Sequence, residues 1–184
     1  MFETADRSEF TRVIDLSESE EKLLKNMTRG HRTAITQARR EGVEVVLNPG
    51  FDLFLEHHLT TEGRKNRNPR CWEIMRELIE QGRAFLMGAR YKKKWTAFGY
   101  FFIYGDWGYY CSANIKKEYY HLKPSHIIQW EAMKHMKRNR IVFYEIGDQY
   151  PHGAPSEKQE AIAKFKRGFG GETKVVVDMW KQRE

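Results

Sequence analysis

Apolar and polar positions recur with two different periods along this chain, and the changes of period mark the predicted helices and strands. Near the N-terminus, the Ser-Glu-Ser-Glu stretch at residues 17–20 has the form of a capping box, which predicts the start of a helix. A second helix is predicted over residues 30–41, because Ile35 and Ala38 share one face and Gly42 is a typical residue just beyond a helix end.

The middle of the chain predicts a strand, two helices and then three strands with no helix between them. The first strand and the two helices are predicted at residues 43–47, 51–66 and 71–81. The last of these helices places Ile74 and Met75 on its inner side. The three strands are predicted at residues 84–91, 95–104 and 107–113. Short turns at residues 92–94 and 105–106 join them, so the sequence predicts an antiparallel meander.

The C-terminal third predicts a crossover connection between parallel strands. A helix begins near Pro124, which suits a first helical turn, and a strand follows at residues 141–146. A strand, a helix and another strand in this order form a parallel unit. Ser156 opens a second capping box and a helix through Phe165, and residues 173–178 alternate as a final strand. The predicted fold class is α/β (α+β), with a mixed sheet.

Composition and charge indicate which classes of partner the protein can bind. The 184 residues are 40% hydrophobic, which suffices for the core of one domain. The formal net charge is +7, which favours acidic partners such as nucleic acid, phosphates or an anionic membrane surface, although a basic soluble protein has the same composition. The most basic stretches are the helix at residues 30–41 and the loop at residues 62–70.

Metal, disulfide and targeting signals are not found in the sequence. Cys71 and Cys111 are too few for a disulfide framework, and the histidines lack ligand spacing, so no structural metal is expected. The N-terminus has no basic and apolar leader pattern, and no apolar run is long enough to span a membrane. We therefore expect a cytoplasmic protein.

Four stretches carry a resemblance to a known family. They are HRTAI at residues 31–35 leading into EGV at 41–43; YYCSA at 109–113; PSHIIQW at 124–130; and YEIG at 144–147 with FK at 165–166 and FG at 169–170. In this order they resemble the FemABX-type aminoacyltransferases and their GNAT-like relatives. The resemblance implies a GNAT-like domain at residues 43–184, preceded by a helical segment at residues 1–42. That family usually has two such domains, of which this chain is similar to the second, and Glu145 stands where the family more often has Asp.

The resemblance also implies a site and a reaction. GNAT enzymes hold an acyl donor in a wedge between the two strands that flank the crossover helix, here residues 107–113 and 141–146. FemABX enzymes move an aminoacyl group from aminoacyl-tRNA to an amine of a peptidoglycan precursor, and relatives use other acyl donors. The resemblance therefore implies no tightly bound cofactor, with aminoacyl-tRNA or acyl-CoA as co-substrate. Acetyl-CoA enzymes have a glycine-rich loop before the crossover helix, whereas residues 119–125 contain no glycine and Pro124 removes one N–H donor. Ser125, in the first turn of that helix, is expected to bind donor or acceptor.

Two basic residues match functional positions of the family, and an aromatic residue stands beside one of them. Lys166 matches a lysine near the donor, so it is expected to bind the terminal phosphate of tRNA or the developing oxyanion; the alternative is a solvated lysine. Phe165 is expected to pack on the terminal nucleotide or acceptor, or else in the core. Arg64 matches an arginine that binds an acceptor phosphate, or else faces solvent.

Further candidates lie on the strand at residues 107–113, just after the strand at residues 141–146, and after the last helix. Tyr109 and Tyr110 alternate along one strand, so one faces the wedge and the other packs. Asp148 is expected to orient the acceptor amine, with an ordinary turn aspartate as the alternative. Gly147 and the glycines of residues 168–171 predict a close approach of the backbone to a ligand, because glycine has no Cβ.

Three functions are therefore compatible with the sequence. The first is a FemABX-like N-acyltransferase acting on a tRNA-borne or other anionic donor and a peptidoglycan precursor or other amine. The second is an acetyl-CoA-dependent N-acetyltransferase of the same fold. The third is a non-catalytic RNA-binding module that uses the basic helix and loop. Two further possibilities stay open. One is a peripheral membrane contact, and the other is a homodimer or a partner domain in place of the first GNAT domain.

Overall fold

Seven strands form one mixed sheet at the centre of the protein. The computed structural model describes residues 3–4, 9–62, 67–177 and 179–180. The strand order is β3-β4-β5-β6-β7-β2-β8. Along the chain the strands are β2 (Glu9–Asp15), β3 (Glu44–Leu47), β4 (Ala84–Tyr91), β5 (Lys94–Tyr104), β6 (Trp107–Ile115), β7 (Phe143–Gln149) and β8 (Glu172–Val176). A separate two-stranded antiparallel sheet pairs β1 (Glu3–Thr4) with β9 (Met179–Trp180).

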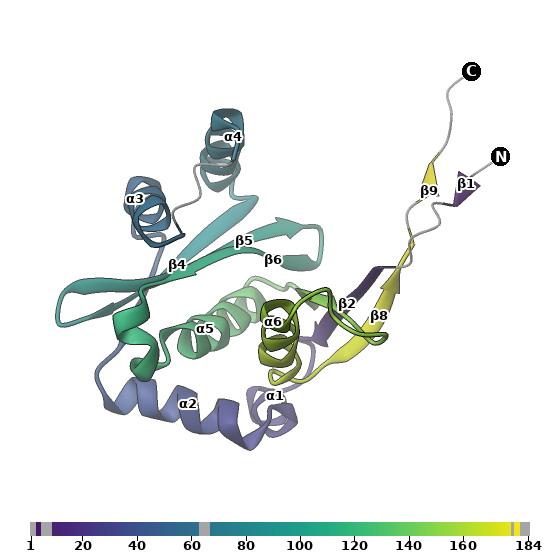
Figure 1. Cartoon of the computed structure of the whole chain (residues 1–184), viewed down its shortest axis with the longest axis horizontal. Coiled ribbons are helices and arrows are strands. Elements are labelled where there is room, and N and C mark those ends of the chain that lie inside the picture. The colour runs from purple at the N-terminus through teal and green to yellow at the C-terminus, as the bar shows by residue number, and fades with distance from the viewer. Residues whose placement is uncertain (1–2, 5–8, 63–66, 178, 181–184) are drawn as a thin grey trace.

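Helices cover both faces of the large sheet (Figure 1). Helices α3 and α4 lie on one face, and α5, α6, α2 and α1 lie on the other. Their bounds are α1 (Glu20–Asn26), α2 (Arg29–Arg40), α3 (Phe51–Glu62), α4 (Pro69–Glu80), α5 (Pro124–Arg138) and α6 (Glu157–Arg167), with a 3₁₀ turn η1 (Lys117–Leu122) before α5. Each face has its own apolar cluster, one centred on Trp130, Phe101 and Tyr144 and the other on Phe54, Phe98 and Tyr100. Burying each such side chain contributes roughly 1.5–3 kcal/mol.

The predicted meander and crossover are both confirmed. Strands β4, β5 and β6 are antiparallel neighbours, and β6 pairs with β7 in parallel. Helix α5 connects those two parallel strands, with Pro124 as its first residue. The strand predicted at residues 141–146 begins two residues later, at Phe143, because its pairing with β6 starts there opposite Trp107; Val142 and Phe143 both donate their N–H groups to the Asp106 carbonyl.

Strand β2 was not predicted from the sequence. Residues 1–42 were expected to be helical, but residues 9–15 form a strand between β7 and β8, antiparallel to both. Val13 and Ile14 are adjacent in sequence and both are buried, so the strand does not show a simple apolar and polar alternation. The sheet therefore contains two strands beyond β7, of which only β8 was predicted.

Two local predictions were wrong and one was confirmed. Helix α1 is capped by Ser19, which accepts the Lys22 N–H, rather than by Ser17, whose N–H donates to Asp15 Oδ1 at 2.8 Å. Ile74 was expected on the inner side of α4 but is 42% exposed. Ser156 caps α6 as predicted, and its Oγ accepts the Gln159 N–H at 3.3 Å.

Candidate active site

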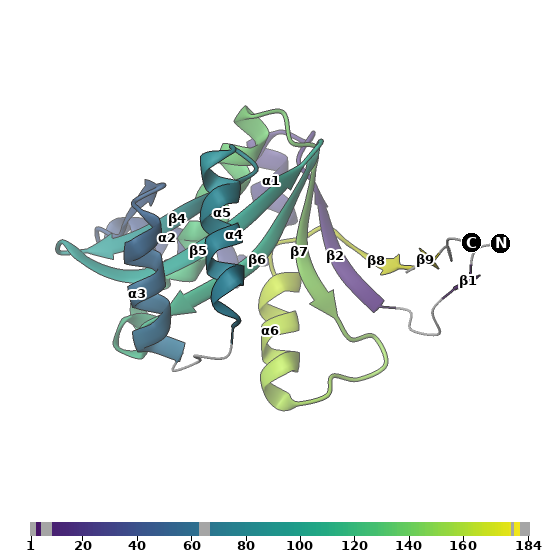
Figure 2. The same cartoon turned by 90° about the horizontal axis from the view of Figure 1, so that it is seen from above.

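Strands β6 and β7 separate after a short region of pairing. Their parallel ladder runs from Trp107 opposite Phe143 to Tyr109 opposite Glu145. Both strands then continue, β6 to Ile115 and β7 to Gln149, without further pairing to each other. Figure 2 shows the two strands fanning apart, with α6 close to the opening. The predicted wedge is therefore a feature of the sheet.

Helix α6 brings Lys166 to this wedge at Gly147. A Cβ built on Gly147 would lie 2.6 Å from Lys166 Nζ, and Gly147 has a φ of +99°. Glycine is thus required both for the backbone conformation and for the space that the ammonium occupies. Burial lowers the pKa of Lys166 below its usual range, and the carboxylates of Asp148 and Glu145 act in the opposite direction.

A phenol and two carboxylates also lie at the wedge. Tyr109 is the register partner of Glu145, so the two side chains share a face of the sheet. Burial raises the pKa of Tyr109, and the nearby charges of Glu145 and Asp148 raise it further. Thr11 Oγ1 donates a hydrogen bond of 2.8 Å to Glu145 Oε1, which fixes that carboxylate. Tyr109, Glu145, Asp148 and Lys166 are thus electrostatically coupled.

Tyr110 lies in a different environment from Tyr109. Its ring stacks on Phe101 at 5.4 Å between centroids and packs against the apolar cluster on the α5 face. Burial raises the pKa of Tyr110 to about 12, and a hydrogen bond with Gln129 offsets part of that rise. The structure thus places Tyr109 at the wedge and Tyr110 against the apolar cluster on the α5 face.

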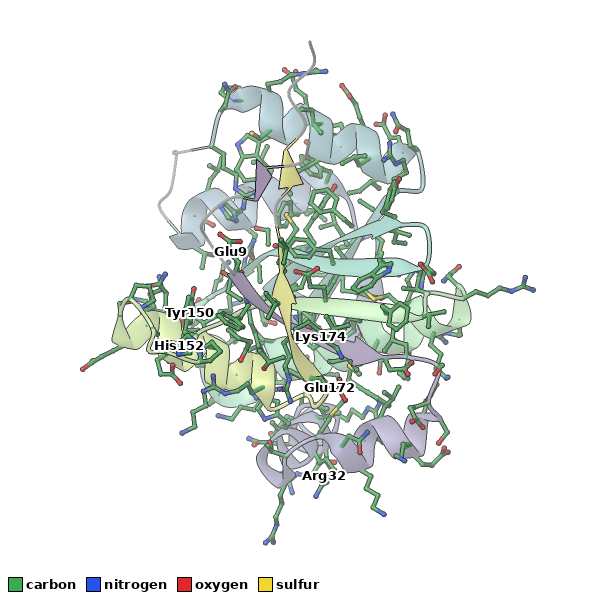
Figure 3. The ribbon with its side chains drawn as sticks, turned by 90° about the vertical axis from the view of Figure 1, so that its right-hand side faces the viewer. Glu9, Arg32, Tyr150, His152, Glu172 and Lys174 are labelled. Atoms are coloured by element: carbon green, nitrogen blue, oxygen red, sulfur yellow. The ribbon has the colours of Figure 1, made fainter. Side chains whose placement is uncertain are left out.

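A hollow adjoins Asp148. It has a volume of about 300 Å³, and its walls include Glu9, Tyr150 and His152. Figure 3 shows Tyr150 and His152 together on the loop after β7, with Glu9 above them. Burial raises the pKa of Tyr150, and the charge of Asp148 adds to that rise. Asp148 therefore acts on the charge of Lys166 and also lines this hollow.

Phe165 belongs to an aromatic cluster between α2, α5 and α6. His31, His126 and Phe169 surround it, and ring centroids of Phe165 and His126 are 5.0 Å apart. His31 Nε2 donates to the Phe165 carbonyl at 2.8 Å, which leaves Nδ1 to accept the Thr28 hydroxyl at 2.9 Å. Phe165 thus packs in the protein, and the cluster holds the last turn of α6 beside the first turn of α5, where Ser125 is partly buried.

The glycines that follow α6 approach the protein's own atoms. A Cβ on Gly168 would lie 2.0 Å from the His31 ring, and one on Gly171 would lie 2.2 Å from the Val13 carbonyl oxygen. Arg12 Nε donates to the Gly170 carbonyl at 2.7 Å. The close approach predicted for this stretch is therefore to β2 and α2, and only Gly147 lies at the wedge.

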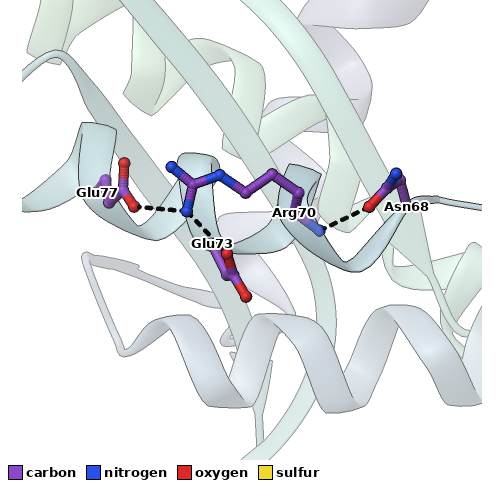
Figure 4. Close-up of polar contacts among 4 residues, drawn as sticks. All are labelled: Asn68, Arg70, Glu73 and Glu77. Carbon is purple, nitrogen blue, oxygen red and sulfur yellow. Dashed lines mark hydrogen bonds and ion pairs between the residues drawn. The ribbon is translucent and has the colours of Figure 1, made fainter.

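The described arginines of the predicted basic loop make different contacts. Arg64 lies outside the described residues. Arg67 Nη2 donates to Ser112 Oγ at 3.3 Å, and its guanidinium lies over the Trp72 ring. Arg70 is held within α4, where its Nη1 bonds Glu73 at 2.8 Å and Glu77 at 3.2 Å, and its N–H donates to Asn68 (Figure 4). Arg70 is thus neutralised by its own helix.

Glu145 and its hydrogen-bond donor Thr11 were not among the sequence candidates. Thr11 was missed because β2 was not predicted. Glu145 was noted in the motif but was not assigned to the site; its signal is a carboxylate inside an otherwise apolar strand. Among the described residues, no group of three or more His, Cys, Asp or Glu side chains is placed to hold a metal ion. No described helix is both long and apolar enough to cross a membrane.

Comparisons with known proteins show the fold. No protein-family model matches this sequence, and no curated protein sequence matches it. The structure is similar to that of FemX, with a TM-score of 0.79 and 14% identity over 94% of this chain and 63% of FemX. It is also similar to the C-terminal domain of a protein from Agrobacterium fabrum described as a lysylphosphatidylglycerol synthetase, with a TM-score of 0.63 and 9% identity over 96% and 60% of the two chains. A tandem GNAT protein from the clavulanic acid biosynthesis pathway has a TM-score of 0.50 and 12% identity over 97% and 55%.

The class of protein follows from these similarities and the sheet. The chain has a GNAT-like fold, as its element order predicts. More particularly, the fold is of the FemAB type that FemX shows. The chain spans less than two thirds of the length of each of these three proteins.

Proposed function

We propose that this chain is an N-acyltransferase that transfers an aminoacyl or other acyl group from an activated ester donor to an amine. The observation that carries the proposal is the Lys166 ammonium, held against Gly147 where β6 and β7 separate. The FemAB-type fold supports it, since a similar structure carries the name of a lysylphosphatidylglycerol synthetase. We propose aminoacyl-tRNA as the donor and an amine of a peptidoglycan precursor as the acceptor.

The proposed reaction uses the charges around the wedge. A neutral amine attacks the acyl carbonyl, so a C–N bond forms and the carbonyl oxygen becomes an oxyanion that the Lys166 ammonium stabilises. The C–O bond of the ester then breaks, and the electron pair leaves with the donor oxygen. Asp148 accepts the surplus proton of the amine and passes it on to the leaving oxygen, which becomes a hydroxyl. The carboxylates of Asp148 and Glu145, the latter fixed by Thr11, oppose the effect of burial on the pKa of Lys166.

The donor choice rests on the N-terminal end of α5. Residues 119–125 contain no glycine, and Pro124 offers no N–H, so the backbone cradle of an acetyl-CoA enzyme is incomplete. A tRNA terminus needs fewer backbone contacts because its phosphates can bind basic side chains along a longer surface. The net charge of +7 favours such a donor.

A transfer assay with Lys166 and its neighbour tests the proposal. The assay follows a labelled aminoacyl group from aminoacyl-tRNA to a peptidoglycan precursor peptide with a free amine. Lys166→Met should lower the transfer rate ~10²–10³-fold, which is typical of losing one oxyanion ligand. Lys164→Met is the matched control, because it removes an exposed lysine of the same helix and should leave the rate unchanged.

Other outcomes would reject the proposal in favour of the alternatives. Lys166-dependent acetylation of the amine from acetyl-CoA, with no use of aminoacyl-tRNA, would assign the chain to the acetyltransferases. Tight, salt-dependent RNA binding with no acyl transfer from either donor would indicate an RNA-binding module.

A further inference from the structure

A second, strongly basic pocket lies away from the wedge. It has a volume of about 580 Å³ and is bounded by α3, the β4–β5 turn and the end of β6. In Figure 1 the β4–β5 hairpin projects on the side of the molecule opposite β8. None of its lining residues belongs to the wedge group of Tyr109, Glu145, Asp148 and Lys166. Its size is in the range of pockets that bind small molecules.

Lysines from two separate segments surround this pocket. Lys93 and Lys94 come from the β4–β5 turn, and Lys116 and Lys117 come from the end of β6 and the start of η1. Two carboxylates, Glu56 and Glu118, also line it, and neither forms an ion pair with these lysines among the described contacts. The four ammonium groups thus outnumber the carboxylates and remain available to an anion.

The turn that carries two of these lysines is conformationally unfavourable. Tyr91 pairs with Lys94, so Lys92 and Lys93 form a two-residue hairpin turn, and their φ angles are +48° and +65°. Such turns favour Asn-Gly, because residues with a Cβ are strained at positive φ. Retaining a lysine where glycine would be more stable is typical of a position whose side chain has a function.

The interior wall offers a polar atom and an aromatic surface. His57 is 5% exposed, and its Nδ1 bonds Asn114 Oδ1, which can only accept, so Nδ1 carries the proton. The Nε2 atom is buried and has no hydrogen-bond partner within the described part of the chain. Burial lowers the pKa of His57, and contacts with Asn114 and the Trp95 backbone act in the opposite direction. With the proton on Nδ1, Nε2 of the neutral ring is an acceptor. Trp95 lines the same pocket and is partly exposed.

We propose that this pocket binds a phosphorylated small molecule that also carries hydroxyl groups, such as a nucleotide or a sugar phosphate. The four lysines bind the phosphates, a ligand hydroxyl donates to His57 Nε2, and the ring or sugar packs on Trp95. The site is separate from acyl transfer and does not depend on the proposed function.

Calorimetric titration with ADP and with pyrophosphate tests the site. ADP should bind at one saturable site and more tightly than pyrophosphate, since only ADP has a ribose and a ring. Lys116→Gln with Lys117→Gln should weaken ADP binding about tenfold or more, through two lost charged contacts. The matched control, Lys22→Gln with Lys25→Gln, removes two exposed lysines of α1 and should leave the affinity unchanged. Equal losses in both double variants, or no saturable binding of ADP to the wild-type chain, would overturn the proposal.

Lys93→Gly separates loss of binding from loss of folding. Glycine relieves the positive φ, so the variant should melt ~2–4 °C higher without ligand while binding ADP more weakly. The imidazole ¹⁵N signal of His57 Nε2 should also shift when ADP is added. A more stable Lys93→Gly variant with unchanged affinity, or a His57 signal that ADP does not shift, would show that the pocket does not bind in this way.

Discussion

Replacing Gly147 with alanine is the most direct perturbation of the wedge. The added Cβ would lie 2.6 Å from Lys166 Nζ, so the ammonium must leave its position. Because Nζ is the end of a flexible side chain, it can move at little energetic cost. The variant therefore removes the charge from the wedge while keeping the lysine in the protein.

The structure allows both effects of this change to be estimated. Alanine at a φ of +99° is strained by ~1–3 kcal/mol, which a domain with ~5–15 kcal/mol of stability tolerates. The melting temperature should therefore fall by roughly 2–4 °C per kcal/mol. Displacing a catalytic group by about 1 Å costs ~10²-fold in rate, so transfer should fall at least that far.

Two measurements test whether Gly147 acts through Lys166. In labelled protein, the pKa of Lys166 should rise towards the usual lysine value in Gly147→Ala, because the displaced ammonium loses the burial that lowers it. Gly147→Ala combined with Lys166→Met should transfer no more slowly than Lys166→Met alone, since both changes remove the same interaction.

Gly50→Ala is the matched control for strain. Gly50 has a φ of +123°, and an added Cβ there meets only Leu53, at 3.8 Å, in an ordinary contact. This control should lose similar stability yet keep both the Lys166 titration and the transfer rate. If Lys166 titrates in Gly147→Ala as it does in the wild type, or if Gly50→Ala loses transfer equally, the reasoning about Gly147 is wrong.

Three further predictions concern stability. Burial lowers the pKa of His126 to about 4 and also lowers that of His31, so the unfolded chain binds protons more readily than the folded protein. Chemical denaturation should therefore show stability falling as the pH drops from ~6.5 towards 4, by up to ~1.4 kcal/mol per pH unit for each histidine. An unchanged dependence of stability on pH in His126→Gln would contradict this. Gly171→Ala should cost ~3 kcal/mol or more in urea unfolding, because its Cβ would lie 2.2 Å from the Val13 carbonyl oxygen and its φ is +76°; a cost under 1 kcal/mol would refute this. Gly30→Ala should instead stabilise the protein by ~0.5–1 kcal/mol, since the site is helical and open, and a loss of stability would show an unrecognised contact.

Local chemistry in the sequence determined most of the individual elements. The meander is predictable because two short turns, at residues 92–93 and 105–106, leave adjacent strands no choice but to pair antiparallel. The crossover helix is predictable because Pro124 suits a first turn and Ile127, Ile128, Ala132 and Met136 lie on one buried face. The resemblance carried by short motifs predicted the GNAT-like fold, and Lys166 and Gly147, both predicted as site residues, lie together.

Only the tertiary structure decided what each candidate contacts. A phenylalanine followed by glycines is equally compatible with a binding site and with a packed turn. The three-dimensional contacts place Phe165 and the glycines after α6 against His31 and β2. Thr11 is 134 residues from Glu145 in sequence, so no local pattern could pair them. The burial that lowers the pKa of Lys166, and the separation of β6 from β7 beside it, arise from the long-range order of the sheet, which periodicity along the chain does not specify.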